Sequence, residues 1–153
     1  MSRRHAPLEG SPNYVVNASS VADIQLAVNF ARNTNFRLVV EDISHDFLGR
    51  STGKYALSVW TRHLKSIDYV PDYSTELYIG PILEIDSGVQ ASELYEFANR
   101  NIIIVIGGRG ETVGVMGGHI LGSGHPPLSS IYGLAVDQTI ALEAIHPNGT
   151  FTI

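Results

Sequence analysis

The fold of this chain is organised around residues 107–125, which read GGRGETVGVMGGHILGSGH. This stretch holds eight of the fifteen glycines and directly follows the apolar run at residues 102–106. Glycine costs backbone entropy on folding, so such a concentration is favoured where the main chain needs positive φ angles or close approach of another group. Exposed backbone N–H groups form concave nests that bind anions or the polar edge of a large ligand. The apolar run therefore predicts a buried strand over residues 102–106, and the glycine-rich stretch predicts a cofactor-binding loop directly after it.

Two common glycine-rich sites have a different spacing. A P-loop requires G-x-x-x-x-G-K-[ST], whereas residues 49–55 (GRSTGKY) are one residue short and place Tyr55 where a magnesium-binding hydroxyl belongs. A dinucleotide fingerprint requires G-x-G-x-x-G between a strand and a helix. Gly108, Gly110 and Gly114 do not have that spacing, and no helical pattern follows them. The sequence excludes a P-loop and disfavours a standard Rossmann site.

A second glycine-containing loop lies at residues 44–53 (SHDFLGRSTG). Together with residues 107–125 and their continuation PPLSSIYGLAVD to residue 137, it resembles the FAD-binding domain of FAD-linked oxidases. Within that group the chain is most similar to the fungal berberine-bridge-enzyme-like oxidoreductases, from about residue 12 to residue 153. The resemblance implies an α+β fold, namely a PCMH-type FAD-binding domain made of two small α/β subdomains with FAD between them.

The resemblance also implies a role for particular residues of both loops. It places at His45 the histidine that is covalently bonded to the 8α-methyl group of the flavin, and neutral imidazole is a competent nucleophile near neutral pH. For Asp137, a turn or cap role fits equally well. The residues expected to contact FAD are His45, Asp46, Gly49, Arg50, Ser51, Gly107, Gly108, Gly110, Thr112, Val113, Gly114, Gly117, Gly118, Gly122, Gly124, His125, Gly133 and Asp137.

The chain contains no cysteine, which removes disulfides, thiolate nucleophiles and thiolate metal sites. Some members of the family tether FAD through a histidine and a cysteine, and the position that matches this cysteine is Gly110. At most one tether, through His45, is therefore expected. His119 and His125 have no third ligand at a regular spacing, so we predict no metal site.

Four residues depart from the family pattern. Glu41 and Asp42 precede the histidine where small residues are usual, and carboxylates close to a pyrophosphate would weaken its binding unless they point away or are neutralised. Met116 and Ser123 stand where glycine is common. Their side chains are expected to intrude where the cofactor and the backbone should touch.

Length and charge limit the partners. The 153 residues, 44% of them hydrophobic, fit one globular domain over residues 12–153 behind a flexible N-terminal segment at 1–11. The formal charge of −5 without a basic stripe disfavours nucleic acid and anionic membranes as partners. No apolar run approaches about 18 residues and no signal peptide is recognised, so the chain as written is expected to be cytoplasmic, although its relatives are often secreted.

The hydrophobic patterns predict the remaining elements. Apolar residues at spacings of three and four, behind a cap at Ser19 or Ser20, predict a helix over residues 20–33. A second helix is predicted over residues 91–99 and a helical turn over 128–132. Residues 71–81 are expected to form a hairpin loop. Strands are predicted at residues 14–16, 37–41, 56–60, 67–70, 82–86, 102–106, 139–146 and 150–153.

The resemblance implies an FAD-dependent oxidoreductase that transfers a hydride from a small organic substrate to flavin, with reoxidation by dioxygen. The substrate-binding and C-terminal parts that supply the catalytic base in this family are not found in the 153 residues, so no catalytic residue is assigned. Two alternatives stay open. The chain is a truncated or split, non-catalytic FAD-binding half that needs a partner chain supplying the substrate domain, or it is a scaffold that has lost FAD.

Overall fold

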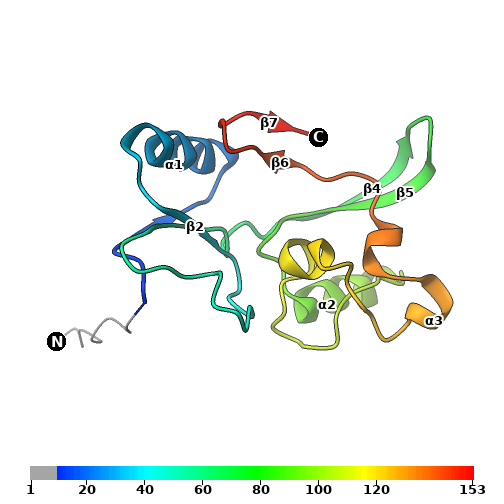
Figure 1. Cartoon of the computed structure of the whole chain (residues 1–153). Helices are drawn as coiled ribbons and strands as arrows, with labels where there is room; N and C mark the ends of the chain where they lie inside the picture. The colour runs from blue at the N-terminus through cyan, green and yellow to red at the C-terminus, as the bar shows by residue number, and fades with distance from the viewer. Residues whose placement is uncertain (1–9) are drawn as a thin grey trace.

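The first lobe of the molecule is a three-stranded parallel sheet with a helix packed on one face. A computed structural model describes residues 10–153, and the prediction of a flexible segment at 1–11 falls largely on residues outside this range. The strands are β1 (Tyr14–Asn17), β2 (Leu38–Glu41) and β3 (Leu57–Trp60), in the order β1-β3-β2. Because all three are parallel, their carboxyl ends lie at one edge, and the long loop between β2 and β3 leaves from that edge (Figure 1).

Helix α1 (Val21–Thr34) forms where the sequence predicts it. The Ser20 hydroxyl accepts a hydrogen bond from the Asp23 backbone N–H at 3.2 Å, which satisfies one of the free donors at the helix start. The helix ends at Asn35, which adopts a left-handed conformation with φ 53°. Its apolar face packs on the sheet, and the core of this lobe contains Ala18, Ala27, Ala31, Leu57 and Val59.

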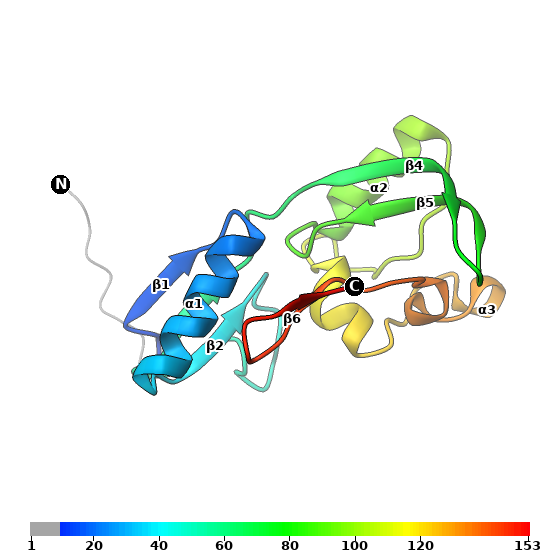
Figure 2. The same ribbon diagram turned by 90° about the horizontal axis from the view of Figure 1, so that it is seen from above.

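The second lobe combines a long hairpin with a helix (Figure 2). Strands β4 (Ile67–Ser74) and β5 (Ile79–Ile85) pair antiparallel, and helix α2 (Ala91–Asn101) follows them. Leu94 of α2 is 1% exposed and packs with Val89 and Val115 in a separate core. Two cores, one in each lobe, agree with the predicted pair of small subdomains.

Two predicted elements in this part of the chain are wrong. Residues 71–81 are not one loop, because β4 continues to Ser74 through an irregularity between Val70 and Tyr73. A two-stranded sheet has only edge strands, and an edge tolerates Pro71. Residues 102–106 form no strand: Ile102 ends α2 in a left-handed conformation and is 94% exposed, and within residues 10–153 no strand pairs with this run.

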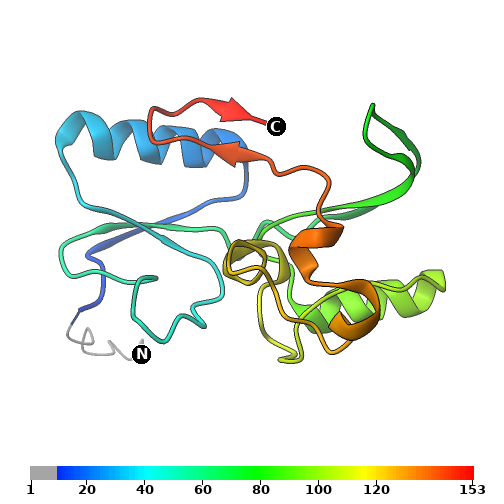
Figure 3. The same ribbon diagram turned by 45° about the vertical axis from the view of Figure 1, so that its right-hand side comes forward.

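The chain then returns to the first lobe. After the single π-helical turn η1 (Val115–His119), the short helix α3 (Ser129–Tyr132) and the 3₁₀ turn η2 (Ala135–Gln138), only β6 (Ala144–Ile145) and β7 (Phe151–Thr152) form a ladder. The predicted strand at 139–146 is therefore much shorter than expected. This hairpin lies beside α1 (Figure 3), where the Arg32 guanidinium donates to the Asn148 carbonyl at 2.6 Å.

Candidate cofactor-binding site

The two glycine-containing loops meet between the lobes. His45 lies in the loop that follows β2, and Thr112 lies in the loop that follows α2. His45 Nε2 and Thr112 Oγ1 are 2.9 Å apart, a normal hydrogen-bond distance, although 67 residues separate them along the chain. Both side chains are exposed. The structure therefore brings together the two loops that the sequence pattern singled out.

Asp42 forms a second link between the same loops. Its carbonyl accepts a hydrogen bond from Trp60 Nε1 at 3.2 Å, and its Oδ1 accepts one from Thr61 Oγ1 at 3.3 Å. Its Oδ2 lies against the second loop, where a Cβ on Gly114 would come within 2.5 Å of that oxygen. Gly114 thus allows the Asp42 carboxylate to pack against the main chain of the other lobe.

The two carboxylates that depart from the family pattern have partners inside the chain. Asp42 points toward Thr61 and Gly114, as described above, and Glu41 Oε1 accepts a hydrogen bond from the Ser44 hydroxyl at 2.6 Å. Both carboxylates therefore have hydrogen-bond partners within the chain, and the expectation that they weaken the binding of a pyrophosphate stays a prediction.

Asp42 should make stability depend on pH in a defined direction. Burial raises the pKa of its carboxyl above the usual value of 3.8, against the opposing effect of the Thr61 hydrogen bond. A raised folded-state pKa favours folding below the unfolded pKa, and this contribution is lost as the pH rises through the folded pKa. We therefore expect Asp42→Asn to raise the free energy of unfolding, relative to wild type, more at about pH 7 than at about pH 4.

Urea denaturation of both proteins at the two pH values measures this difference. Asp72→Asn provides the control, because Asp72 is exposed on β4. If the free energies of unfolding of wild type and Asp42→Asn differ by the same amount at both pH values, the expectation is contradicted.

An ion pair between Asp46 and Arg50 lies within the first loop. Asp46 Oδ2 accepts from the Arg50 backbone N–H at 2.6 Å, and its Oδ1 accepts from Arg50 Nη2 at 2.5 Å, which lowers the pKa of the Asp46 carboxyl. The Arg50 side chain is still 76% exposed. Gly49 between them has φ 71° and no atom within 4 Å of where a Cβ would stand. Bare main chain and an exposed guanidinium therefore lie side by side in this loop, followed by the half-buried Ser51.

The glycines of the second loop fall into two groups. Gly107 and Gly108 are buried against Tyr95 and His119, and the Tyr95 hydroxyl donates to the Gly108 carbonyl at 2.7 Å. A Cβ on Gly124 would lie 2.6 Å from the Cβ of Ala135. By contrast, a Cβ on Gly118 would meet no atom of residues 10–153 within 4 Å. Some predicted cofactor glycines therefore serve internal packing, whereas others leave the main chain bare.

The remaining predicted residues have varied surroundings. Gly117 lies against Asp42, and Gly122 approaches the Gly118 carbonyl. Gly110 is exposed and Val113 half-buried. Asp137 Oδ2 accepts from the Leu134 backbone N–H at 2.8 Å, so it caps η2, the alternative that the sequence left open.

The two other departures from the family pattern are accommodated locally. Met116 packs into the core of the second lobe. Ser123 adopts a left-handed conformation with φ 73°, which explains why glycine would suit its position, since this region disfavours residues with a Cβ. The Met116 side chain is half-buried and packs against this core, and the expectation that it intrudes on the cofactor stays a prediction.

The two histidines of the second loop have different surroundings. His119 is half-buried, its Nε2 has no hydrogen-bond partner within residues 10–153, and burial lowers its pKa. His125 is exposed. Across the described residues no three His, Asp or Glu side chains gather into a group that could hold a metal ion.

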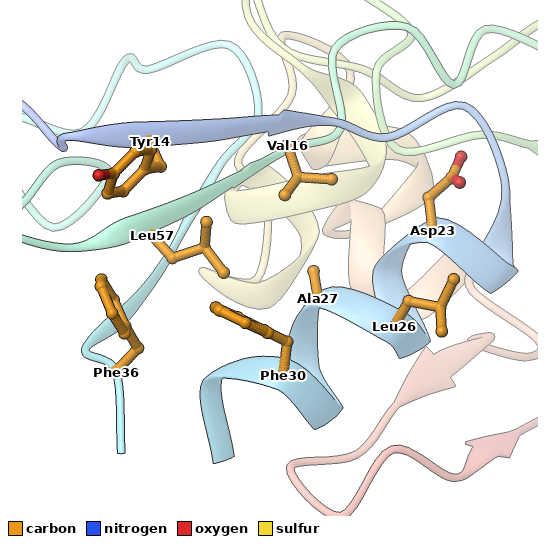
Figure 4. Close-up of a pocket in the computed structure, with 8 residues that line it drawn as sticks. All are labelled: Tyr14, Val16, Asp23, Leu26, Ala27, Phe30, Phe36 and Leu57. Carbon is orange, nitrogen blue, oxygen red and sulfur yellow. The ribbon is translucent and has the colours of Figure 1, made fainter. Parts of the chain in front are cut away.

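A separate hollow of about 590 Å³ lies between α1 and the sheet (Figure 4). Apolar side chains converge on it from β1, from α1 and from the segment that follows α1, including Tyr14, Phe30 and Phe36. Asp23 is the one charged residue in its lining. An anionic dinucleotide finds no cationic group there, so this hollow does not compete with the paired loops as its site.

Two residues of the loop junction escaped the sequence reasoning. Tyr95 ties α2 to the second loop through the Gly108 carbonyl, and Thr61 binds Asp42. Tyr95 lies on the helix next to Leu94, and its spacing gave no sign of a polar partner 13 residues away. Thr61 follows Trp60 at the carboxyl end of β3. Ligands often bind at that end of parallel strands, and this position was the only indication in the sequence that Thr61 lies near the site.

No helix within residues 10–153 combines the length and the apolar character that a membrane span requires.

Comparison with known proteins places the chain among flavoproteins. Residues 12–153 match the family model described as FAD binding domain. The VAO-type flavoprotein oxidase VAO615 of Thermothelomyces thermophilus is 42% identical over 138 residues, and the FAD-linked oxidoreductase patO of Aspergillus clavatus is 43% identical over 136. The first match covers 90% of this chain and the second 89%, but each covers only 24% of the relative. This chain thus spans about a quarter of their length.

The fold is similar to solved structures of the same group. The crystal structure of the VAO-type flavoprotein MtVAO615 from Myceliophthora thermophila C1 superimposes with a TM-score of 0.89 at 41% identity. The superposition covers 92% of this chain and 26% of that structure. The α+β architecture with paired lobes is therefore that of a VAO-type FAD-binding domain.

Proposed function

This chain belongs to the FAD binding domain family, and we propose that it is the FAD-binding part of an FAD-dependent oxidoreductase acting on a small organic substrate. The observation that carries the proposal is the contact between His45 and Thr112, because it joins the two loops that the family resemblance assigns to the cofactor. Both side chains are exposed, so their atoms are accessible to a ligand between the lobes.

The residues present fit such a cofactor. At Gly49 and Gly118 the space where a Cβ would stand is open, so a pyrophosphate can approach the main chain closely. The exposed Arg50 guanidinium adds a positive charge beside Gly49. In the described residues no hydrogen bond engages His45 Nδ1, which leaves a nitrogen free for a covalent tether. We propose that the members of the predicted set with an exposed side chain or open main chain, such as His45, Arg50 and Gly118, face the cofactor. The packed members, such as Gly124 and Asp137, hold the loops in shape.

When bound, the flavin supplies the redox chemistry by accepting a hydride from a substrate C–H bond and passing the electrons to dioxygen. The part of this chain is to bind and orient the cofactor. The paired loops would hold the cofactor, and Asp42 joins them through its contacts with Thr61 and Gly114. Groups that would bind the substrate or take its proton are expected in the part of the relatives outside the match, which covers about a quarter of them.

The atoms and electrons of the proposed covalent tether can be accounted for. The tether would join an imidazole nitrogen of His45 to the 8α carbon of the flavin, with loss of one hydrogen from that carbon and one from the imidazole. The two electrons and two protons released would reduce dioxygen to hydrogen peroxide. The chain has no cysteine, and Gly110 stands at the position of the second tether, so a single bond is expected.

An absorbance scan of the purified chain, with and without added FAD, tests the proposal. We expect flavin bands in the protein fraction, together with quenched or altered fluorescence of the added FAD. Colour that survives acid precipitation would support the tether, and colour released by acid would support bound but untethered FAD. Protein that stays colourless after incubation with excess FAD would overturn the proposal in favour of a scaffold without cofactor.

A second measurement separates an active chain from a non-catalytic half. If the flavin-loaded chain is reduced by candidate substrates without another protein, it carries out the hydride transfer alone. If it binds FAD but only light or dithionite reduces the flavin, the chain acts as the cofactor-binding half of a larger enzyme.

A further inference from the structure

The contact between His45 and Thr112 bears on where the imidazole proton lies. Nε2 is 2.9 Å from Thr112 Oγ1, and in residues 10–153 Nδ1 takes part in no hydrogen bond. A neutral imidazole carries one proton, so one nitrogen donates and the other holds a free lone pair. Only a nitrogen with a free lone pair is a nucleophile. Nδ1 can therefore react only while the proton lies on Nε2.

We propose that Thr112 is a positioning residue for His45. Its hydroxyl oxygen accepts a hydrogen bond from Nε2–H, and this bond holds the ring in the tautomer that presents Nδ1 to the cofactor. The inference rests on the proposed function, since it names the residue that prepares the same histidine for its tether.

The surroundings of the pair favour this assignment. A carboxylate beside Nδ1 would draw the proton to that nitrogen, but the acidic residues near His45 are engaged elsewhere. Asp46 binds Arg50 through both oxygens, Glu41 accepts from Ser44, and Asp42 faces Thr61. Within the first loop none of these carboxylates forms a hydrogen bond with the ring. Thr112 Oγ1 is the partner of Nε2, and of the two roles that a hydroxyl can take we assign it that of the acceptor.

Thr112 is itself held in place. Its backbone carbonyl accepts a hydrogen bond from Gln90 Nε2 at 2.8 Å, and the next N–H, of Val113, donates to the Gly110 carbonyl at 3.1 Å. The hydroxyl therefore projects from a main chain that the second lobe fixes, whereas His45 projects from the first lobe. The side chain of a histidine in an exposed loop would otherwise rotate freely, and the contact with Thr112 of the second lobe fixes the orientation of the His45 ring.

The tautomer can be read without any cofactor. In nitrogen NMR spectra of the FAD-free chain near neutral pH, we expect His45 to show a protonated Nε2 and an unprotonated Nδ1, assigned by its absence in His45→Gln. Thr112→Val should give a mixture of both tautomers, and Thr112→Ser should restore the wild-type pattern because it keeps the hydroxyl. A proton on Nδ1 in the wild type, or the same spectrum in Thr112→Val, would overturn the proposal.

The second readout is the rate at which acid-stable flavin accumulates after FAD is added to the FAD-free chain. Loss of one hydrogen bond to the reacting group should slow this rate about tenfold in Thr112→Val, with Thr112→Ser close to wild type. The chain contains a matched control, since His146 Nε2 and Thr152 Oγ1 are also 2.9 Å apart in the C-terminal hairpin. Thr152→Val should leave the rate unchanged.

Two outcomes distinguish this inference from the proposed function. A wild-type chain that takes up no FAD would refute the proposed function, while the NMR result still decides the role of Thr112. A Thr112→Val variant that binds FAD normally and forms the acid-stable product at the wild-type rate would refute the positioning role alone.

Discussion

Replacing His45 with alanine is expected to remove all acid-stable flavin from the protein. The imidazole is the proposed nucleophile, and alanine offers no atom that could form the bond. His45 is exposed and its one hydrogen bond is to Thr112, so the change should hardly alter folding, because surface substitutions usually shift the free energy of unfolding by less than about 0.5 kcal/mol. Flavin absorbance in the protein pellet after acid precipitation, measured beside the absorbance before precipitation, checks this.

The His45→Ala variant should still take up FAD noncovalently. The bare main chain of the loops and the Arg50 guanidinium do not depend on the imidazole, so the colour should be present before acid treatment and absent afterwards. His146→Ala serves as the control, because His146 makes an equivalent histidine to threonine contact far along the chain. Acid-stable flavin in His45→Ala would show that the tether lies elsewhere.

The sequence predicts local structure well where its signals are local. The cap at Ser20 and the apolar spacing of α1 lie within one stretch of chain, so the helix is found within one residue of its predicted ends. The run at 102–106 has the composition of a buried strand, but a strand needs a partner from elsewhere in the chain. No such partner lies beside it in the described structure, and Ile102 and Ile104 stay largely exposed.

The candidate site likewise combines features that local sequence signals predict with contacts between distant residues that they do not. Composition and spacing identified two unusual loops, and the family resemblance singled out His45, but neither could show that its imidazole contacts Thr112. That contact depends on how two lobes pack, and 67 residues separate the partners. Spacing also cannot tell a glycine that packs against the protein from one that faces a ligand. Gly124 and Gly118 lie six positions apart in one loop, yet only Gly124 is surrounded by other atoms.

This contrast between two glycines leads to the second large effect. Replacing Gly124 with alanine should destabilise the fold by roughly 2–4 kcal/mol, a large part of the 5–15 kcal/mol typical of a domain. Gly124 has φ 61°, a conformation that costs a residue with a Cβ about 1 kcal/mol or more. The added methyl would also lie 2.6 Å from the Cβ of Ala135 and 2.9 Å from His119 Nε2, so η2 and the second loop must move apart.

Gly118→Ala is the matched change in the same loop. It meets nothing within 4 Å and has no positive φ, so its free energy of unfolding in urea should stay within about 0.5 kcal/mol of wild type. If the bare main chain at Gly118 faces the cofactor, this variant should nevertheless bind added FAD more weakly, because the methyl group enters space that the protein itself leaves open. Stability and FAD uptake should thus separate: Gly124→Ala loses stability first, and Gly118→Ala loses affinity alone. Equal destabilisation of the two variants would contradict the division of these glycines into packing and ligand-facing groups.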